Sequence, residues 1–272
     1  MKILVTGANG FIGKNLVHSL KDHEVMGIAR DDLDLNNRTE VNRFFKYRSF
    51  DIVIHCAISG GRLQISDGPE VLWENLSMFY NLLNNKNKFT KLINIASGAE
   101  LDRSQPIDLT NQDFKDKYPL DYYGMSKNII SRIVDSEKNM HNIRVFNVFG
   151  YNEDEQRMIK SSIKKYISKD KIIIHQDKLM DFFYIEDLIL LINYYINNNA
   201  FPKDINAVYK TKYHLSEIAE MINNLSDYKV DIKIEQRGLS NSYIGKGMVT
   251  EMLPIEFKGL EKGITEIYNK LK

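Results

Sequence analysis

A tyrosine and a lysine within LDYYGMSKN, residues 120–128, have the types and the spacing that proton transfer requires. Lys127 follows Tyr123 by four residues, so on a helix both side chains lie on one face, a turn apart. A free phenol titrates near pH ~10, and a neighbouring ammonium favours the phenolate. The pair therefore predicts that Tyr123 exchanges a proton with a substrate hydroxyl or carbonyl, whereas the adjacent Tyr122 is expected to pack.

A serine stands where an upstream strand is expected to end. The apolar run KLINIA, residues 91–96, is typical of a buried strand, and Ser97, Gly98 and Ala99 follow it as a turn. Ser97 is either a turn residue or a substrate hydrogen-bond donor at the end of that strand. Its position one strand before Tyr123 favours the second interpretation.

Three glycines near the N-terminus have the spacing of a phosphate-binding loop. The apolar run ILVT leads into GANGFIG, where Gly7, Gly10 and Gly13 are each three residues apart, and a helix is expected to follow. Such glycines let the backbone turn tightly and approach a pyrophosphate, while the helix N-terminus offers unpaired N–H groups to the anion. The alternative is a purely structural turn, but the strand before and the helix after favour a dinucleotide.

The end of the next expected strand, EVMGIA, bears on the choice of dinucleotide. An acidic side chain at that position would bind the adenosine ribose of NAD and repel the 2′-phosphate of NADP. Ala29 stands there instead, and Arg30 follows as a cation able to hold the extra phosphate. NADP(H) is therefore favoured as cofactor, with NAD(H) as the alternative if Arg30 is merely solvated.

These candidate residues need a scaffold that gathers them, and the alternation of elements predicts one. Short Val- and Ile-rich runs alternate with longer segments of helical period from KILVTG through RVFNVFG. Strands separated by helix-length crossovers are parallel, and right-handed crossovers cover both faces of the sheet. The fold class is therefore α/β, with a doubly wound parallel sheet forming a Rossmann dinucleotide-binding domain over residues 1–150. The looser pattern of residues 151–272 predicts a small mixed α/β C-terminal lobe for substrate, with some elements returning to the first domain.

In combination, these motifs resemble the extended short-chain dehydrogenases/reductases, the family of NAD(P)-dependent sugar-nucleotide epimerases, dehydratases and reductases. The similarity runs from GANGFIG through HCA at residues 55–57, YGMSK and RVFNVFG to MDFFYIEDL. It implies that Ser97, Tyr123 and Lys127 form a catalytic triad, with Lys127 also bonding the nicotinamide ribose. It implies a substrate contact from Ser97 and Asn147. The cofactor-binding residues implied by the loop, the strand ends and the triad are Gly7, Asn9, Gly10, Phe11, Ile12, Gly13, Arg30, Asp34, Leu35, Ala57, Tyr123 and Lys127.

The residues after Ser97 narrow the reaction within this family. The family's 4,6-dehydratases carry an acidic pair directly after the serine or threonine, and its GDP-fucose synthases carry a cysteine two residues after it. Gly98 and Ala99 occupy these positions here, and neither titrates. Simple carbonyl chemistry remains, which favours an NADP(H)-dependent reductase of a nucleotide-linked 4-keto-(6-deoxy) sugar. An NAD-dependent C4 epimerase uses the same residues and is the alternative, and a non-catalytic cofactor-sensing regulator is a third hypothesis.

Composition and charge bound the partners. The 272 residues are 43% apolar with a formal charge of +1, which indicates no bias towards nucleic acid or membranes. Cys56 is the only cysteine, the N-terminus has no signal-peptide pattern, and the histidines show no metal spacing, so we expect a cytoplasmic protein without a metal. Many relatives dimerise through the tyrosine-bearing helix, where four apolar positions fit such a homodimer face: Ile129, Ile130, Ile133 and Val134.

Several departures from the family leave the sugar and its nucleotide carrier open. Leu101 and Asp102 replace the usual Tyr-Gly after the serine, and Met180 replaces the usual arginine before Asp181. Three basic residues are candidates for the substrate diphosphate, although isolated basic side chains are more often solvated. They are Arg62, Arg157 and Lys160.

Overall fold

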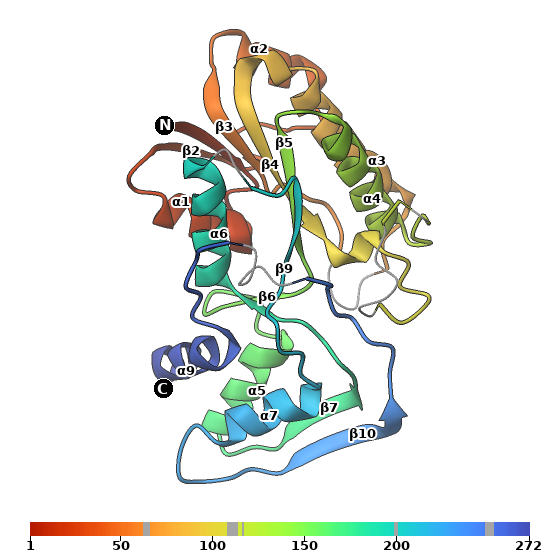
Figure 1. Ribbon diagram of the computed structural model, residues 1–272, viewed down its shortest axis with the longest axis vertical. Helices are drawn as coiled ribbons and strands as arrows, with labels where there is room; N and C mark the ends of the chain where they lie inside the picture. The colour runs from red at the N-terminus through yellow and green to blue at the C-terminus, as the bar shows by residue number, and fades with distance from the viewer. Residues whose placement is uncertain (62–65, 108–113, 116, 199–200, 248–252) are drawn as a thin grey trace. The chain divides into compact units, whose positions relative to one another are not determined.

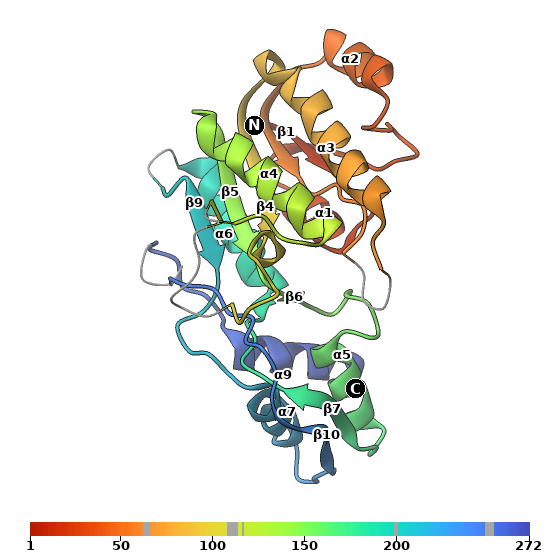
Figure 2. The same ribbon diagram turned by 90° about the vertical axis from the view of Figure 1, so that its right-hand side faces the viewer.

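The computed structural model describes residues 1–61, 66–107, 114–115, 117–198, 201–247 and 253–272. The chain forms two compact units, each built from several segments (Figures 1 and 2). Unit 1 comprises Met1–Ser104, Asp113–Arg144 and Leu191–Ile205, and unit 2 comprises Gln105–Gln112, Val145–Leu190 and Asn206–Lys272.

Unit 1 is built around a six-stranded sheet with the strand order β2-β1-β3-β4-β5-β9. The strands are β1 (Lys2–Thr6), β2 (Glu24–Ile28), β3 (Phe50–His55), β4 (Phe89–Ser97), β5 (Met140–Val145) and β9 (Asp204–Ala207). The pairings of β1 with β2, β1 with β3 and β3 with β4 are parallel. The strand order reverses between β1 and β3, and loops leaving the carboxyl ends of these two strands border the crevice where open α/β sheets bind ligands.

Helices cover the sheet and connect its strands. They are α1 (Phe11–Ser19), α2 (Arg38–Lys46), α3 (Pro69–Leu83) and α4 (Tyr122–Ser136), with short 3-10 turns η1 (Lys86–Lys88) and η2 (Gly98–Glu100). Local sequence starts them: Asn37 accepts from the first amides of α2, Pro69 opens α3, and Asp121 Oδ1 accepts from Gly124 N at 2.7 Å at the start of α4. Figure 1 shows α3 and α4 running side by side.

The apolar faces of these elements form the core of unit 1. Phe45, Phe79 and Leu82 of the helices are fully buried against Val53 and Leu92 of the sheet. On α4, Ile130 and Val134 are buried in this core, and Ile129 and Ile133 pack against it while staying partly exposed. The face predicted for dimerisation is therefore largely the face that holds α4 on its own sheet.

Unit 2 contains two small parallel strand pairs and several helices. The strands are β6 (Val148–Phe149), β7 (Ile172–Asp177), β8 (Phe183–Tyr184) and β10 (Ile232–Leu239), with β7 pairing β10 and β6 pairing β8. The helices are α5 (Met158–Ile167), α6 (Ile185–Asn197), α7 (Leu215–Asn223) and α9 (Leu260–Leu271). Helix α6 begins in unit 2, and its residues from Leu191 onward belong to unit 1.

The prediction of a doubly wound parallel sheet with a small mixed lobe is confirmed. The sequence predicts that the first domain ends at residue 150. In the structure, the first segment of unit 1 ends at Ser104, and residues 191–205 return to unit 1 and lead into β9, which completes the sheet. Contiguous residue ranges therefore describe the chain only approximately, since two later segments cross back.

Candidate functional site

The loop after β1 has the close packing that its glycines predict. Gly7 has a φ of +68°, and a Cβ placed on it would lie 2.7 Å from Ala57 N. Gly10 N donates to Gly7 O at 2.9 Å, and a Cβ on Gly13 would lie 2.3 Å from that same oxygen. No side chain caps the N-terminus of α1, which begins at Phe11. The backbone amides of this first turn are therefore available to an anion.

A cavity of about 100 Å³ opens beside this loop, and it gathers residues from several strand ends. Five of the predicted cofactor residues line it: Gly7, Arg30, Asp34, Leu35 and Ala57. Sequence reasoning missed its apolar lining by Leu33, Ile58 and Met78, because an apolar residue beside a cavity looks in sequence like any core residue. A hollow with apolar walls next to a glycine-rich helix start fits the adenosine end of a dinucleotide.

Arg30 lies at the rim of this cavity. Its side chain is 63% exposed and pairs with Glu74 of α3 at 3.4 Å, a long and solvated contact. Behind it, Asp32 Oδ2 accepts from Ala29 N at 2.8 Å and closes the turn after β2. The guanidinium is therefore free to exchange a weak partner for an anionic ligand.

Ser97 and Tyr123 meet through their side chains. Ser97 ends β4 and is buried, while Tyr123 lies in the first turn of α4 and is half-buried. Burial raises the pKa of the Tyr123 phenol, and the hydrogen bond with Ser97 and the charge of Arg103 act in the opposite direction. A Cβ placed on Gly61 would lie 2.8 Å from the Tyr123 ring, so the loop after β3 closes against the phenol.

Lys127 is buried one turn further along α4. Its Nζ donates to Ile95 O at 2.8 Å, and burial lowers the pKa of its ammonium to about 8. The sequence predicts a phenol with a lowered pKa beside this cation, and the structure differs, because burial of Tyr123 has the larger effect. At neutral pH the phenol therefore stays protonated, and the lysine remains largely charged.

His55, buried at the end of β3, and the partly exposed Cys56 that follows it both interact electrostatically with Lys127. Burial and the nearby Lys127 lower the pKa of His55 to about 3, and burial raises the pKa of the Cys56 thiol to about 12. Thr6 Oγ1 is within 3.0 Å of His55 Nδ1 and accepts from Cys56 N and Ala57 N, each at 3.2 Å. Thr6 therefore ties the carboxyl end of β3 to that of β1. Nothing in its sequence context signals this contact.

A further residue that sequence reasoning missed joins the loop after β3 to α4. Asn75 of α3 is buried, accepts from Ser59 N at 2.7 Å and donates to Ser59 O at 3.0 Å. It also donates to Ser126 Oγ at 3.0 Å, and Ser126 in turn donates to Tyr123 O at 2.7 Å. The amide of Asn75 thus links the loop after β3 to the turn of α4 that carries Tyr123.

The predicted substrate residues of unit 2 that the structure describes are bonded to other residues of the same unit. Asn147 lies between β5 and β6, and its Nδ2 donates to Asp181 O at 2.9 Å. The Asp181 side chain is bound by Lys212 Nζ at 2.7 Å and by Gly245 N at 2.7 Å. Lys160 is buried and donates to Glu153 O at 2.9 Å, which favours a structural role over a diphosphate contact. The candidate Arg62 lies outside the described residues.

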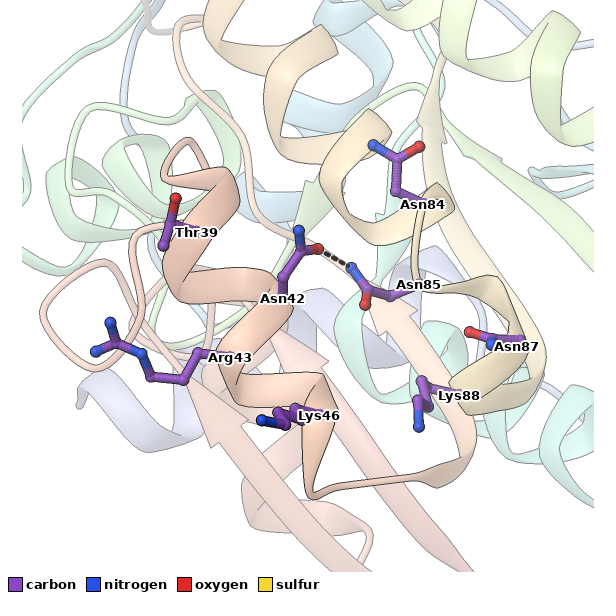
Figure 3. A pocket seen from close by; sticks show the side chains of 8 residues that line it. All are labelled: Thr39, Asn42, Arg43, Lys46, Asn84, Asn85, Asn87 and Lys88. Atoms are coloured by element: carbon purple, nitrogen blue, oxygen red, sulfur yellow. Dashed lines mark hydrogen bonds between the residues drawn. The ribbon is translucent and has the colours of Figure 1, made fainter.

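A larger and more open hollow lies at the opposite end of the strands, beside their amino ends (Figure 3). It is lined by the ends of α2 and α3 with η1, where Arg43, Lys46 and Lys88 stand among asparagines. Asn85 Nδ2 donates to Asn42 Oδ1 at 2.9 Å across it. These segments precede β3 and β4, so the hollow adjoins the amino ends of the strands, whereas the predicted cofactor residues and the triad gather at the carboxyl ends.

Two other findings limit the chemistry of the described part of the chain. No group of three or more His, Cys, Asp or Glu side chains there is arranged to hold a metal ion. Among those same residues, no helix has both the length and the apolar character needed to cross a bilayer.

The chain is similar in sequence to one protein family and to several named proteins. A family model described as the NAD dependent epimerase/dehydratase family matches residues 3–207. The chain is 29% identical to a GDP-L-colitose synthase of Yersinia pseudotuberculosis, over 98% of this chain and 96% of that protein. It is 27% identical to a GDP-6-deoxy-D-talose 4-dehydrogenase of Aggregatibacter actinomycetemcomitans, over 86% and 83%. A dTDP-4-dehydro-6-deoxy-D-allose reductase of Streptomyces bikiniensis is 24% identical, over 97% and 94%.

Solved structures share the fold at lower identity. A GDP-mannoheptose C4 reductase from Campylobacter jejuni with NADP bound superposes with a TM-score of 0.84 at 17% identity, covering 99% of this chain and 98% of that one. A UDP-glucose 4-epimerase from Thermotoga maritima gives a TM-score of 0.79 at 17% identity, covering 100% and 98%.

Proposed function

The chain belongs to the NAD-dependent epimerase/dehydratase family, and within it we propose an NADP(H)-dependent reductase of a nucleotide-linked 4-keto sugar. Relatives named as a GDP-6-deoxy-D-talose 4-dehydrogenase and a dTDP-4-dehydro-6-deoxy-D-allose reductase support oxidation or reduction at a single sugar carbon. The observation that carries the proposal is the side-chain contact between Ser97, at the end of β4, and the half-buried Tyr123 of α4, whose raised pKa keeps the phenol protonated at neutral pH.

In this proposal a bound NADPH would supply the hydride for the carbonyl carbon of the sugar. Tyr123 donates its phenolic proton to the carbonyl oxygen, and Ser97 donates a hydrogen bond to that oxygen. The raised pKa of Tyr123 suits this direction, because reduction needs the phenol in its protonated form. The Lys127 ammonium, held at Ile95 O, stabilises the phenolate that is left after the transfer.

The surroundings of Ser97 argue against a dehydratase. Gly98 and Ala99 carry no titratable group, and the nearest acid along the chain is Glu100. Both carboxylate oxygens of Glu100 are engaged in the interior, one by Arg144 and one by Ser131. A carboxylate with these partners is not placed to protonate a leaving hydroxyl, so a single-carbon redox step is the chemistry that the turn supports.

Arg30 supports NADP(H) as the cofactor. Its guanidinium lines the cavity beside the phosphate loop and pairs with the exposed Glu74 at the long distance of 3.4 Å. An NADP-bound relative of the same fold agrees with this choice. Gly7, whose Cβ would collide with Ala57, and the uncapped start of α1 fit the pyrophosphate, and Asp34 with Leu35 fits the adenosine.

A C4 epimerase is the alternative function, since it uses the same triad and returns the hydride to the opposite face of the sugar carbon. It differs in keeping its cofactor bound through each cycle. A structure of a UDP-glucose 4-epimerase shares the fold, which is equally compatible with either reaction. Cofactor exchange therefore distinguishes the two.

The proposal is tested by incubating the purified protein with NADPH and a panel of GDP- and dTDP-linked 4-keto-6-deoxy sugars. We expect NADPH absorbance to fall in step with formation of one 4-hydroxy product. Co-purified NAD with interconversion of C4 epimers, and no net NADPH loss, would establish the epimerase instead.

The role of Tyr123 is tested with Tyr123→Phe. A general acid contributes about 10²–10⁴-fold to rate, so we expect kcat to fall by that order. Affinity for NADPH, measured by fluorescence titration, should stay close to the wild-type value. Full cellular activity in this variant would revive the hypothesis of a cofactor-sensing regulator.

We further propose a cytoplasmic homodimer formed through the outer faces of α3 and α4. Trp73 is 68% exposed and Tyr80 is 44% exposed, and their separation of seven residues places both on one face of α3. Tyr122 of the adjacent α4 is also exposed. Sedimentation should give a dimer that Trp73→Glu with Tyr80→Glu converts to a monomer, whereas Tyr47→Glu at the end of α2 should not. A monomeric wild-type protein would refute the proposal.

A further inference from the structure

Glu100 is a buried acid that the proposed reaction does not use. It ends η2, three residues after Ser97, and its side chain is fully buried in unit 1. Arg144 of β5 donates from Nε to Glu100 Oε1, and Ser131 of α4 donates to Oε2 at 2.5 Å. A buried carboxylate with two such donors is built into the structure at a cost, since unpaired burial of its charge would be strongly unfavourable.

The partners of Glu100 belong to a wider ion cluster. Arg144 also binds Asp204 of β9 through two contacts, of 2.5 and 2.7 Å, and its guanidinium lies 5.0 Å from the centre of the Phe114 ring. Asp204 is partly exposed, whereas Arg144 and Glu100 are buried. Figure 1 shows β4, β5 and β9 in one sheet. Arg144 lies in β5 and Asp204 in β9, while Glu100 comes three residues after the end of β4.

Glu100 also joins the Ser97 turn to the helix that carries the other two residues of the triad. Its carbonyl oxygen accepts from Asn128 Nδ2 at 2.8 Å, and a Cβ on Gly124 would lie 2.4 Å from the neighbouring Ala99 O. Ser131 follows Lys127 by four residues, so Tyr123, Lys127 and Ser131 succeed one another along one face of α4. The Glu100 carboxylate, bound to Ser131, therefore lies at the far end of the face of α4 that carries Tyr123 and Lys127.

We propose that Glu100 is a positioning residue for the proposed reaction: its carboxylate, held by Arg144 and Ser131, fixes the Ser97 turn on α4 and supplies buried negative charge that keeps Lys127 protonated. This inference rests on the proposed function for its kinetic consequence alone. Among the described residues, no carboxylate is bonded directly to Lys127, whose Nζ donates to the Ile95 carbonyl.

The charges around both groups agree with this role. Burial raises the pKa of the Glu100 carboxyl, while Arg144 and Ser131 favour its ionised form and Asp204 opposes it. Glu100 raises the pKa of Lys127 against the effect of burial. It also raises the pKa of Tyr123.

Among the described residues, the other titratable groups that act on Lys127 from a neighbouring element lie at the end of β3 and are neutral at pH 7. The pKa of His55 is lowered to about 3, and that of Cys56 is raised to about 12. Asp121 and Arg103, which face Tyr123, act on the phenol with opposite signs. Glu100 is therefore the acidic side chain to which the protonation of Lys127 is most sensitive.

The test is the titration of Lys127 followed by NMR in protein carrying lysine labelled with ¹³C at Cε, with Lys127→Arg identifying the resonance. Because an opposite charge favours the ionised form, we expect Glu100→Gln to move this titration to lower pH by about one unit. Ser131→Ala removes a hydrogen bond to Glu100 but no charge, and it should leave the titration in place. An unchanged titration in Glu100→Gln, or an equal shift in Ser131→Ala, overturns the proposal.

The paired replacement of Glu100→Gln with Arg144→Met keeps the test decisive if the single variant folds poorly. Replacing both members of the Glu100–Arg144 pair leaves neither of these two charges buried without the other, and Asp204, which loses Arg144, is partly exposed to water. The Lys127 titration should again move to lower pH in this variant. The same titration as in the wild type would count against the role of Glu100.

The kinetic readout separates this inference from the proposed function. In reduction, both Tyr123 and Lys127 must be protonated, so the fall of kcat at high pH should shift to lower pH in Glu100→Gln and not in Ser131→Ala. If the wild type reduces none of the 4-keto sugars, the proposed function fails and the NMR titration still decides the role of Glu100. If the wild type is active but neither readout shifts, the role of Glu100 is refuted while the function stands.

Discussion

At the scale of single residues, burial decides the protonation of Tyr123 and Lys127, two members of the candidate triad. Lys127 is buried and Tyr123 is half-buried, and desolvation disfavours charge at both, so the pKa of the phenol rises and that of the ammonium falls to about 8. The phenol is then an acid at neutral pH, and the ammonium stays largely charged. These directions favour reduction of a carbonyl over removal of a proton from a hydroxyl.

We expect one residue, Arg30, to govern the choice of cofactor. We expect Arg30→Asp to lower the preference for NADPH over NADH by at least about tenfold, since a carboxylate repels the 2′-phosphate and accepts from the ribose hydroxyls. The ratio of kcat/KM for the two cofactors measures it. Arg43→Asp, in the hollow beside the amino ends of the strands, is the matched control and should leave the ratio unchanged. An unchanged ratio in Arg30→Asp would place the 2′-phosphate elsewhere.

At the scale of elements, the turn between β1 and α1 depends on backbone contact with the end of β3. Gly7 combines a φ of +68° with a backbone neighbour only 2.7 Å from the position of a Cβ. An L-residue in this conformation costs about 1–2 kcal/mol through strain alone, and the collision with Ala57 adds to it. The loop can therefore accept no side chain at Gly7 unless Ala57, which follows β3 and lines the candidate cofactor cavity, moves away.

The contribution of that collision can be isolated with a second glycine. Gly238 in β10 has a φ of +78° and nothing within 4 Å of its Cβ position. We expect Gly238→Ala to show the strain alone, in free energy of unfolding measured with urea. Gly7→Ala should lose more stability than this control and should bind NADPH at least about tenfold more weakly. Equal losses in the two variants, with NADPH affinity intact, would contradict the close approach of Gly7 and Ala57.

At the scale of the whole molecule, a buried histidine couples stability to pH. The pKa of His55 is lowered from 6.5 to about 3, so between these values the unfolded chain binds a proton there that the folded chain does not. The stability from a neutral His55 is complete above pH 6.5 and is lost as the pH falls towards 3. Glu153, whose pKa burial raises to about 8, has the opposite dependence.

Comparison of variants separates these contributions. Between pH 6.5 and 5, His55 should account for about 2 kcal/mol of lost unfolding free energy in the wild type. His55→Gln should lose that much less over the same interval, as measured by urea unfolding at the two pH values. His175→Gln changes an exposed histidine and should behave as the wild type does. The same pH dependence in all three proteins would show that His55 titrates in the folded state.

The strands, the helices and the phosphate loop could be predicted because they depend on local pattern. Hydrophobic period and glycine spacing act within a few residues, so the runs from KILVTG to RVFNVFG predict the α/β fold. The four-residue spacing of Tyr123 and Lys127 likewise places both on one face of α4. The fold class follows from such patterns, and the candidate triad is implied by the resemblance to the family that the motifs carry in combination.

Only the tertiary structure decided what surrounds those residues. Thr6, Asn75 and Glu100 act on the candidate site through partners about 30 to 50 positions away, and no local spacing records such contacts. The protonation of Tyr123 is likewise set by burial, which is a sum over many elements and has no signature at the residue itself. The sequence by itself determined which groups are present and on which elements. Folding determined their charges and partners, because desolvation and long-range hydrogen bonds exist only once the sheet and its helices have come together.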